Sequence, residues 1–332
     1  MTSAYAGRRV LVTGADGFIG SHLTEALLHA GADVRAFCFY NSVGSRGWLD
    51  HLPAEGPSAP EVVLGDVRDS RAVDAACDGA EIVFHLAALV GIPYSYVAPE
   101  SVVETNIRGT LNVLEAVRRQ KCARLVHTST SEVYGTPDTT PITERHALKG
   151  QSPYSASKIA ADKLCEAYHG SFDVPVVVLR PFNTYGPRQS ARAVIPTILT
   201  QLLAGRTTIQ LGNLTPRRDL TYVGDTVSGF LAAGLCPGIE GDTIHLGTGR
   251  AESVEEVFRA ACTVTGVQAT VEADPRRVRP ARSEVMVLQS DPSRAKARLG
   301  WEATVSLEEG LGHTARWLGA NLERYRPETY AV

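Results

Sequence analysis

Four residues near the middle of the chain, Thr130, Glu132, Tyr154 and Lys158, are of the types that oxidise a hydroxyl group and then move protons on the product. Tyr154 and Lys158 are four positions apart, which places them one turn apart on the same face of a helix. A lysine ammonium at that spacing is expected to lower the pKa of the tyrosine and make its phenol a usable base near neutral pH. Thr130 adds a hydroxyl hydrogen bond and Glu132 adds a second acid or base. Together they predict oxidation of a sugar hydroxyl followed by further proton chemistry.

Each of these residues also has a plainer interpretation. Tyr and Lys at this spacing occur by chance as a surface pair on a helix, and Glu132 could be a carboxylate that stabilises a helix start. The surroundings favour chemistry, because the pair follows the apolar run 124–127 and a cluster of Ser and Thr residues. We therefore interpret the four side chains as a catalytic group.

A glycine-rich turn near the N-terminus predicts a bound dinucleotide. The apolar run 10–13 ends at Gly14, and a helix follows with Leu23 and Leu27 on one face. Glycines in this context let the backbone approach a pyrophosphate, which then lies at the positive end of the helix. The turn and its helix start supply the predicted cofactor-binding residues Gly14, Gly17, Phe18, Ile19 and Gly20.

The choice between NAD and NADP is less clearly encoded. The acidic residue that usually ends the second strand and binds the adenosine ribose is missing, since residues 38–41 read Cys-Phe-Tyr-Asn and Asp33 comes too early. Arg35 or Arg46 could in principle meet a 2′-phosphate. NAD is preferred and NADP is left open. Asp66, after the third strand, could hold the adenine or could equally be a turn residue that caps a helix.

Apolar runs alternate with helical patterns through the first half of the chain. Further strands are expected at 34–39, 61–64, 82–86, 124–127 and 176–179, and the apolar period of 103–117 predicts a helix. This order predicts an α/β fold with a doubly wound parallel (Rossmann) sheet over residues 1–180. Residues 181–332 are expected to form mainly a smaller C-terminal α/β substrate-binding lobe, partly interleaved with the first domain.

Composition and charge exclude several classes of protein. The chain has 332 residues, 44% of them hydrophobic and 21% charged, with a net charge of −3. This balance gives no electrostatic case for nucleic acid or for an anionic membrane. The six cysteines show no metal-binding spacing, and Gly14 and Asp16 interrupt the first apolar run, so neither a metal site nor a signal peptide nor a membrane span is expected. We expect a cytoplasmic protein.

Several motifs together resemble the extended short-chain dehydrogenases/reductases that act on nucleotide sugars. They are the glycine turn, His85-Leu-Ala-Ala88, Asn106-x-x-Gly109-Thr110, Tyr154-x-x-x-Lys158 and Arg180-Pro-Phe-Asn-Thr-Tyr-Gly-Pro-Arg188. Within that group the chain looks most similar to 4,6-dehydratases of the legionaminic-acid type, which act on nucleotide-linked N-acetylglucosamine. That similarity lies in residues 40–50, 92–96, 151–154 and 189–196. The resemblance also implies that Val67, Leu86, Ala87 and Ala88 border the cofactor and that Tyr154 and Lys158 contact it.

The resemblance implies a 4,6-dehydratase acting on UDP- or GDP-N-acetylglucosamine. Tyr154 would take the proton of the 4-OH as hydride leaves C4, and Thr130 would hydrogen-bond the 4-oxygen. Glu132 would take the C5 proton and return it to the departing 6-OH, and hydride would return to C6. Many dehydratases carry an Asp where this chain has Ser131, although GDP-mannose dehydratases also have Thr-Ser-Glu. UDP-glucuronate decarboxylation, C4 epimerisation and a non-enzymatic nucleotide-binding role are the alternatives.

The remaining predicted contacts belong to the substrate and to a second copy of the chain. Arg217, Arg276 and Arg277 could be only a solvated basic rim, and His85 is expected to be structural. The resemblance implies a homodimer formed by two long helices at 100–119 and 153–170. The residues predicted to bind the nucleotide sugar are Tyr94, Ser95, Ser131, Asn183, Arg192, Arg218 and Arg279.

Overall fold

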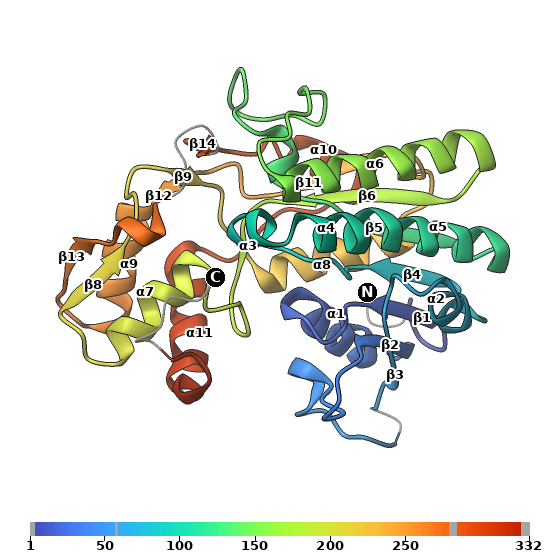
Figure 1. Ribbon diagram of the computed structural model, residues 1–332, viewed down its shortest axis with the longest axis horizontal. Coiled ribbons are helices and arrows are strands. Elements are labelled where there is room, and N and C mark those ends of the chain that lie inside the picture. The colour runs from blue at the N-terminus through green and yellow to red at the C-terminus, as the bar shows by residue number, and fades with distance from the viewer. Residues whose placement is uncertain (1–3, 57–58, 279–283, 327–332) are drawn as a thin grey trace.

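A computed structural model describes residues 4–56, 59–278 and 284–326, and its largest element is one parallel sheet (Figure 1). The sheet order is β11-β6-β5-β4-β1-β2-β3, and every neighbouring pair is parallel. The predicted α/β doubly wound fold is therefore confirmed. The strands are β1 (Arg9–Thr13), β2 (Asp33–Phe39), β3 (Glu61–Gly65), β4 (Ile82–His85), β5 (Arg124–Thr128), β6 (Val176–Pro181) and β11 (Thr243–Leu246).

Helices cover both faces of this sheet, and each face has its own hydrophobic core. One core packs residues of α1 and α8 on the sheet, and the other packs residues of α2, α5 and α6. Coverage on both sides explains why strands such as β4 and β6 are buried along their whole length and begin with runs of apolar residues. The helices of this domain are α1 (Phe18–His29), α2 (Ser70–Cys77), α3 (Ile92–Val97), α4 (Pro99–Val103), α5 (Gly109–Gln120), α6 (Pro153–Phe172), α8 (Val223–Leu235) and α10 (Ser293–Leu299).

The chain does not divide cleanly into two halves at residue 180. Strand β11 and helix α8 come from the second half, yet they complete the sheet edge and one helical layer of the first domain. The helix predicted over 103–117 is also more irregular than its apolar period suggests. It runs from α4 through a π-helical turn, Glu104–Arg108, into α5.

A smaller lobe, at the left of Figure 1, has a core of its own built from α7, α9, α11 and β8. Its helices are α7 (Val194–Leu203), α9 (Val254–Thr265) and α11 (Leu307–Gly319). Its strands are short and form small sheets: β7 (Thr184–Tyr185) with β10 (Thr221–Tyr222), β8 (Thr208–Leu211) with β13 (Thr270–Ala273), and β9 (Arg217–Arg218) with β12 (Glu252–Ser253) and β14 (Val287–Leu288). Single-turn 3₁₀ helices lie at Gly47–Leu49, Ser131–Tyr134, Pro275–Arg277 and Leu322–Arg324.

None of the helices among the described residues combines the length and the apolar character that crossing a bilayer requires. No group of three or more His, Cys, Asp or Glu side chains in the described part of the chain is arranged to hold a metal ion.

Two glycines predict opposite effects of the same substitution. A Cβ at Gly20 would lie 2.0 Å from the carbonyl oxygen of Gly14, whereas a Cβ at Gly170 in α6 would meet nothing within 4 Å. Gly20→Ala should lower the free energy of unfolding by about 2 kcal/mol or more, because backbone atoms must move apart. Gly170→Ala should leave it unchanged or raise it by about 0.5–1 kcal/mol. Urea unfolding of both variants measures the free energy of unfolding. Equal changes in the two variants would contradict a tight contact between Gly20 and the Gly14 carbonyl.

Candidate active site

A cavity of about 710 Å³ lies at the carboxyl ends of the parallel strands. Its lining includes residues at or just after the ends of β1, β2, β3, β4, β5 and β6. Such an edge is where doubly wound folds bind their ligands. The lining contains these predicted site residues: Gly14, Gly17, Phe18, Ile19, Gly20, Asp66, Val67, Leu86, Ala87, Ala88, Tyr94, Thr130, Ser131, Tyr154 and Asn183.

The glycine turn forms one end of the cavity and fits a dinucleotide pyrophosphate. Gly14 has a φ of +68°, and a Cβ there would lie 2.8 Å from the backbone of Ala87. The missing side chains therefore leave room that any other residue would fill. The turn leads directly into α1, whose first backbone N–H groups and dipole favour a phosphate at this point.

Helix α6 positions Tyr154 in its first turn. The N-terminus of the helix is fixed by a capping box in which Ser152 and Ser155 each accept a hydrogen bond from the other's backbone N–H, at 3.1 and 3.0 Å. Thr130, which begins the 3₁₀ turn at the end of β5, lines the cavity with Tyr154, and its hydroxyl is close enough to act on the Tyr154 pKa in the lowering direction. The structure thus brings Thr130 and Tyr154 together at the cavity wall.

The expected effect of Lys158 on Tyr154 is not found. Burial raises the pKa of Tyr154 to about 12, the Thr130 hydrogen bond acts in the lowering direction, and the negative charge of Glu132 acts with burial. The ammonium of Lys158 instead donates to the backbone carbonyl of Thr128, with Nζ 2.7 Å from the oxygen. Burial also lowers the pKa of Lys158 itself. The prediction from helical spacing was wrong on this point because it left desolvation out.

Lys158 is supported from within the protein by a buried polar network that sequence reasoning missed. Asp162, one turn further along α6, accepts hydrogen bonds from Ser129 at 2.8 Å and from Arg180 at 2.9 Å. Burial raises the pKa of Asp162, but hydrogen bonding by His127 and the charges of Arg180 and Lys158 hold it below its usual value. The four-residue spacing from Tyr154 to Lys158 to Asp162 could have revealed this acid.

Glu132 lies close to the catalytic pair but is not part of the cavity lining. Its backbone N–H donates to the hydroxyl of Thr130 at 3.2 Å, and it falls in the first turn of a 3₁₀ helix. Its two chain neighbours on the N-terminal side, Thr130 and Ser131, do line the cavity. The carboxylate is near enough for its charge to raise the pKa of Tyr154.

The walls beside the glycine turn are held by polar contacts. The side-chain amide of Asn106 accepts from Leu89 N–H at 2.8 Å and donates to the Leu89 carbonyl at 3.0 Å, and its nitrogen also donates to Ser157 on α6 at 2.9 Å. Asp66 pairs with Arg68 at 2.5 Å, and it is Asp69, not Asp66, that caps α2. The helix-capping interpretation of Asp66 was therefore wrong. His85 is buried between the hydroxyls of Thr13 and Thr110, at 2.8 and 3.1 Å, as expected of a structural histidine.

The residues predicted to bind substrate are only partly brought together. Tyr94, Ser131 and Asn183 line the cavity, and the buried Nδ2 of Asn183 has no hydrogen-bond partner in the structure. Ser95 does not reach it, because its buried hydroxyl donates to Ile92 at 2.7 Å. Arg192 is exposed and donates at 3.2 Å to the carbonyl of Val90, a lining residue.

The other predicted arginines are engaged elsewhere. Arg218 pairs with Glu284 at 3.1 Å and is not among the lining residues. Arg217 pairs with Glu256, and both Arg276 and Arg277 pair with Asp274, so these three do not form a purely solvated rim. Arg279 lies outside the described residues.

Comparison with known proteins places this geometry among enzymes of nucleotide-sugar metabolism. The family described as GDP-mannose 4,6 dehydratase matches residues 11–314. The chain is 34% identical over 315 residues to a UDP-glucose 4-epimerase of Mycolicibacterium smegmatis, covering 93% of this chain and 98% of the epimerase. It is also 34% identical over 322 residues to a dTDP-glucose 4,6-dehydratase of Actinoplanes sp., covering 94% and 98%. The structure of DesIV, a dTDP-glucose 4,6-dehydratase of Streptomyces venezuelae with NAD bound, matches with a TM-score of 0.85 at 30% identity, over 97% of this chain and 100% of DesIV.

Two buried histidines, His127 and His245, predict that acid destabilises the protein. Burial lowers the pKa of His127 to about 4 and that of His245 to about 3. Below about pH 6.5 the histidines of the unfolded chain bind protons, whereas the two buried imidazoles stay neutral until near pH 4 and 3. The free energy of unfolding should therefore fall by about 3 kcal/mol from pH 6.5 to 5. Urea unfolding across that range measures the slope.

Replacing one buried imidazole tests the origin of that slope. His245→Gln should flatten the decline, while His313→Gln, at a partly exposed position, should leave it unchanged. An identical slope in the wild type and in His245→Gln would contradict the explanation.

Proposed function

We propose a specific reaction for this chain, which belongs to the GDP-mannose 4,6 dehydratase family of NAD-dependent nucleotide-sugar epimerases and dehydratases, within the extended short-chain dehydrogenases/reductases. The reaction is the 4,6-dehydration of an NDP-hexose to the 4-keto-6-deoxy sugar. The observation that carries the proposal is Glu132, two residues after Thr130, whose carboxylate is close enough for its charge to act on the pKa of Tyr154.

The cofactor of the proposed reaction is NAD. The residues that would hold it are those of the glycine turn at the start of α1, together with Leu86, Ala87 and Ala88, which line the same cavity. When bound, it accepts the C4 hydride of the sugar and later donates it to C6, so it is not consumed.

Tyr154 and Thr130 act on the 4-oxygen in the proposed mechanism. Tyr154 takes the proton of the 4-OH as the C4–H bond breaks, and the Thr130 hydroxyl holds the oxygen in place. The neutral phenol that the high pKa implies must first lose its proton. When NAD is bound, the positive charge of its oxidised nicotinamide would favour the phenolate, and Lys158, fixed on the Thr128 carbonyl one helical turn away, would hydrogen-bond the nicotinamide ribose.

Glu132 then performs the elimination. The 4-keto group acidifies C5, Glu132 takes the C5 proton, and the protonated carboxyl returns it to the 6-OH, which leaves as water. C5 regains a proton as hydride enters C6, and this proton balances the one that Tyr154 accepted. Water is therefore the one group lost and the overall reaction is redox-neutral.

C4 epimerisation is the second candidate, and two observations favour it. Glu132 lies just outside the cavity lining, and an epimerase is as similar to this chain as a dehydratase is, at 34% identity in each case. An epimerase needs Tyr154, Lys158 and Thr130 but no carboxylate beside them. The position of Glu132 next to the catalytic pair supports dehydration instead.

The proposed substrate is UDP- or GDP-N-acetylglucosamine. The proposed sugar class is supported by the resemblance of residues 40–50, 92–96, 151–154 and 189–196 to dehydratases of the legionaminic-acid type. Tyr94 and the unpartnered amide of Asn183 offer aromatic and hydrogen-bonding contacts at the cavity wall. We also propose a homodimer through α4–α5 and α6, where Val103 and Phe172 are exposed.

Two variants should separate oxidation from elimination. Tyr154→Phe should abolish the first hydride transfer, because no group takes the 4-OH proton. Glu132→Gln should accumulate reduced cofactor, visible by its absorbance, while slowing water loss at least about 100-fold. Mass spectrometry of the products from UDP-N-acetylglucosamine, GDP-N-acetylglucosamine, UDP-glucuronate and dTDP-glucose, run in parallel, measures the outcome.

Glu308→Gln is the matched control, because Glu308 also lies in the first turn of a helix but on the exposed surface of α11. It should leave the products unchanged. Normal dehydration by Glu132→Gln would overturn the mechanism. Loss of CO₂ from UDP-glucuronate alone would assign a decarboxylase, and unchanged masses with an altered C4 configuration would assign an epimerase.

A further inference from the structure

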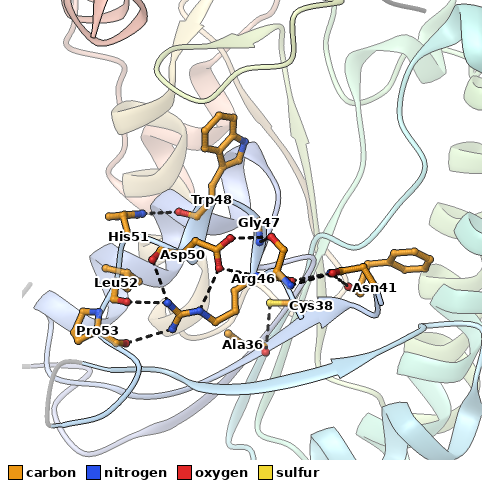
Figure 2. Close-up of polar contacts among 12 residues, drawn as sticks. Ala36, Cys38, Asn41, Arg46, Gly47, Trp48, Asp50, His51, Leu52 and Pro53 are labelled. Atoms are coloured by element: carbon orange, nitrogen blue, oxygen red, sulfur yellow. Dashed lines mark hydrogen bonds and ion pairs between the residues drawn. The ribbon is translucent and has the colours of Figure 1, made fainter. Parts of the chain in front are cut away.

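The loop after β2 folds back onto the glycine turn. Asn41 and Ser45 close it with two hydrogen bonds of 2.8 and 2.9 Å, and Arg46 fixes its far side through Asp50 and the carbonyl of Leu52, the latter at 2.9 Å (Figure 2). Leu49, in the 3₁₀ turn of the loop, is fully buried in the core shared with α1. The loop is therefore an ordered part of the domain, held by its own hydrogen bonds and by the burial of Leu49.

Asp16, the residue before the second glycine of the turn, is held between this loop and β2. Its backbone carbonyl accepts from Trp48 N–H at 3.1 Å, and its carboxylate accepts from Phe39 N–H at 3.2 Å. Gly47 packs directly against it, with a φ of +59°, and a Cβ there would lie 2.6 Å from the Asp16 carbonyl oxygen. Asp16 also lines the cavity.

The carboxylate of Asp16 thus lies at the end of the second strand, where the strand itself usually supplies an acidic residue. In dinucleotide-binding folds of this kind an acid at the end of the second strand accepts a hydrogen bond from the adenosine ribose. Here β2 ends at Phe39, and the next residues, Tyr40 and Asn41, carry no charge. The contact with Phe39 N–H brings the Asp16 carboxylate to that strand end from the neighbouring turn.

We propose that Asp16 binds the adenosine ribose hydroxyls of NAD and excludes the 2′-phosphate of NADP. A carboxylate accepts hydrogen bonds from both hydroxyls and repels a phosphate dianion. The inference rests on the NAD cofactor of the proposed function and does not depend on the elimination step.

The nearby cations support this assignment, because their guanidinium groups are already engaged. Arg35 pairs with Glu61 at 2.8 Å and also donates to backbone carbonyls. Arg46 pairs with Asp50 within its own loop, and Arg68, which lines the cavity, pairs with Asp66. A 2′-phosphate at this strand end would therefore be repelled by the Asp16 carboxylate, while these three arginines already pair with other carboxylates.

Cofactor affinity tests the proposal directly. Asp16→Asn keeps an oxygen that can accept from Phe39 N–H but removes the charge. Titration of nucleotide-free protein with NADH and NADPH, followed by nicotinamide fluorescence, should show that the wild type prefers NADH. The substitution should weaken NADH binding about tenfold or more and affect NADPH less, so that the preference falls at least about tenfold. Asp16→Ser should behave in the same way and serves if the amide variant does not fold.

Asp50→Asn is the control, because it loosens the Arg46 contacts of the same loop without touching the cavity carboxylate. It should leave the NADH preference unchanged. An unaltered preference in both Asp16 variants, an equal loss in Asp50→Asn, or a wild type that does not prefer NADH would each overturn the proposal. A failure of the dehydratase assignment would change the products and not this ratio.

Discussion

The rest of the site depends on how the protein buries the ammonium group of Lys158. A cation in a water-free position is costly unless it is hydrogen-bonded and its charge is balanced. The Thr128 carbonyl accepts from it, and Asp162, held by Ser129 and Arg180, balances its charge one helical turn away. These contacts fix α6 against the carboxyl end of β5. Because Tyr154 is on the same face of α6, they also bring its hydroxyl to Thr130.

The other half of the site follows from the topology of the sheet. Seven parallel strands end at one edge, and residues at the ends of six of them, far apart in the chain, meet around a single cavity. Glycines at the turn after β1 keep that edge open, and Asn106 fixes the segment after β4 by binding the backbone of Leu89. The loop after β2 completes the edge, and its Trp48 N–H binds the carbonyl of Asp16, whose carboxylate accepts from Phe39 N–H.

The extent to which sequence predicts this molecule varies with the kind of interaction. Six strands of the main sheet were predicted because both faces are covered, which makes runs such as 176–179 apolar throughout, whereas β11 (Thr243–Leu246), from the second half of the chain, was not. The two-residue strands of the lobe have no such signal. The lining positions of Thr130, Tyr154 and the glycine turn followed from motif spacing, whereas Ser95 points into the protein although its neighbour Tyr94 does not. The direction of the Tyr154 pKa and the roles of Asp162 and Asp16 depend on burial and on contacts between distant segments, which spacing alone does not contain.

In the proposed 4,6-dehydration, one site removes hydride from C4 of a sugar and returns it to C6 after Glu132 has expelled the 6-OH as water. The most direct measurement is to supply the nucleotide sugar with deuterium at C4 and to locate the label in the product by NMR. The proposed dehydration predicts deuterium at C6 of a 4-keto-6-deoxy sugar. Deuterium found at C4 of an epimer, or of a decarboxylated sugar, would contradict it.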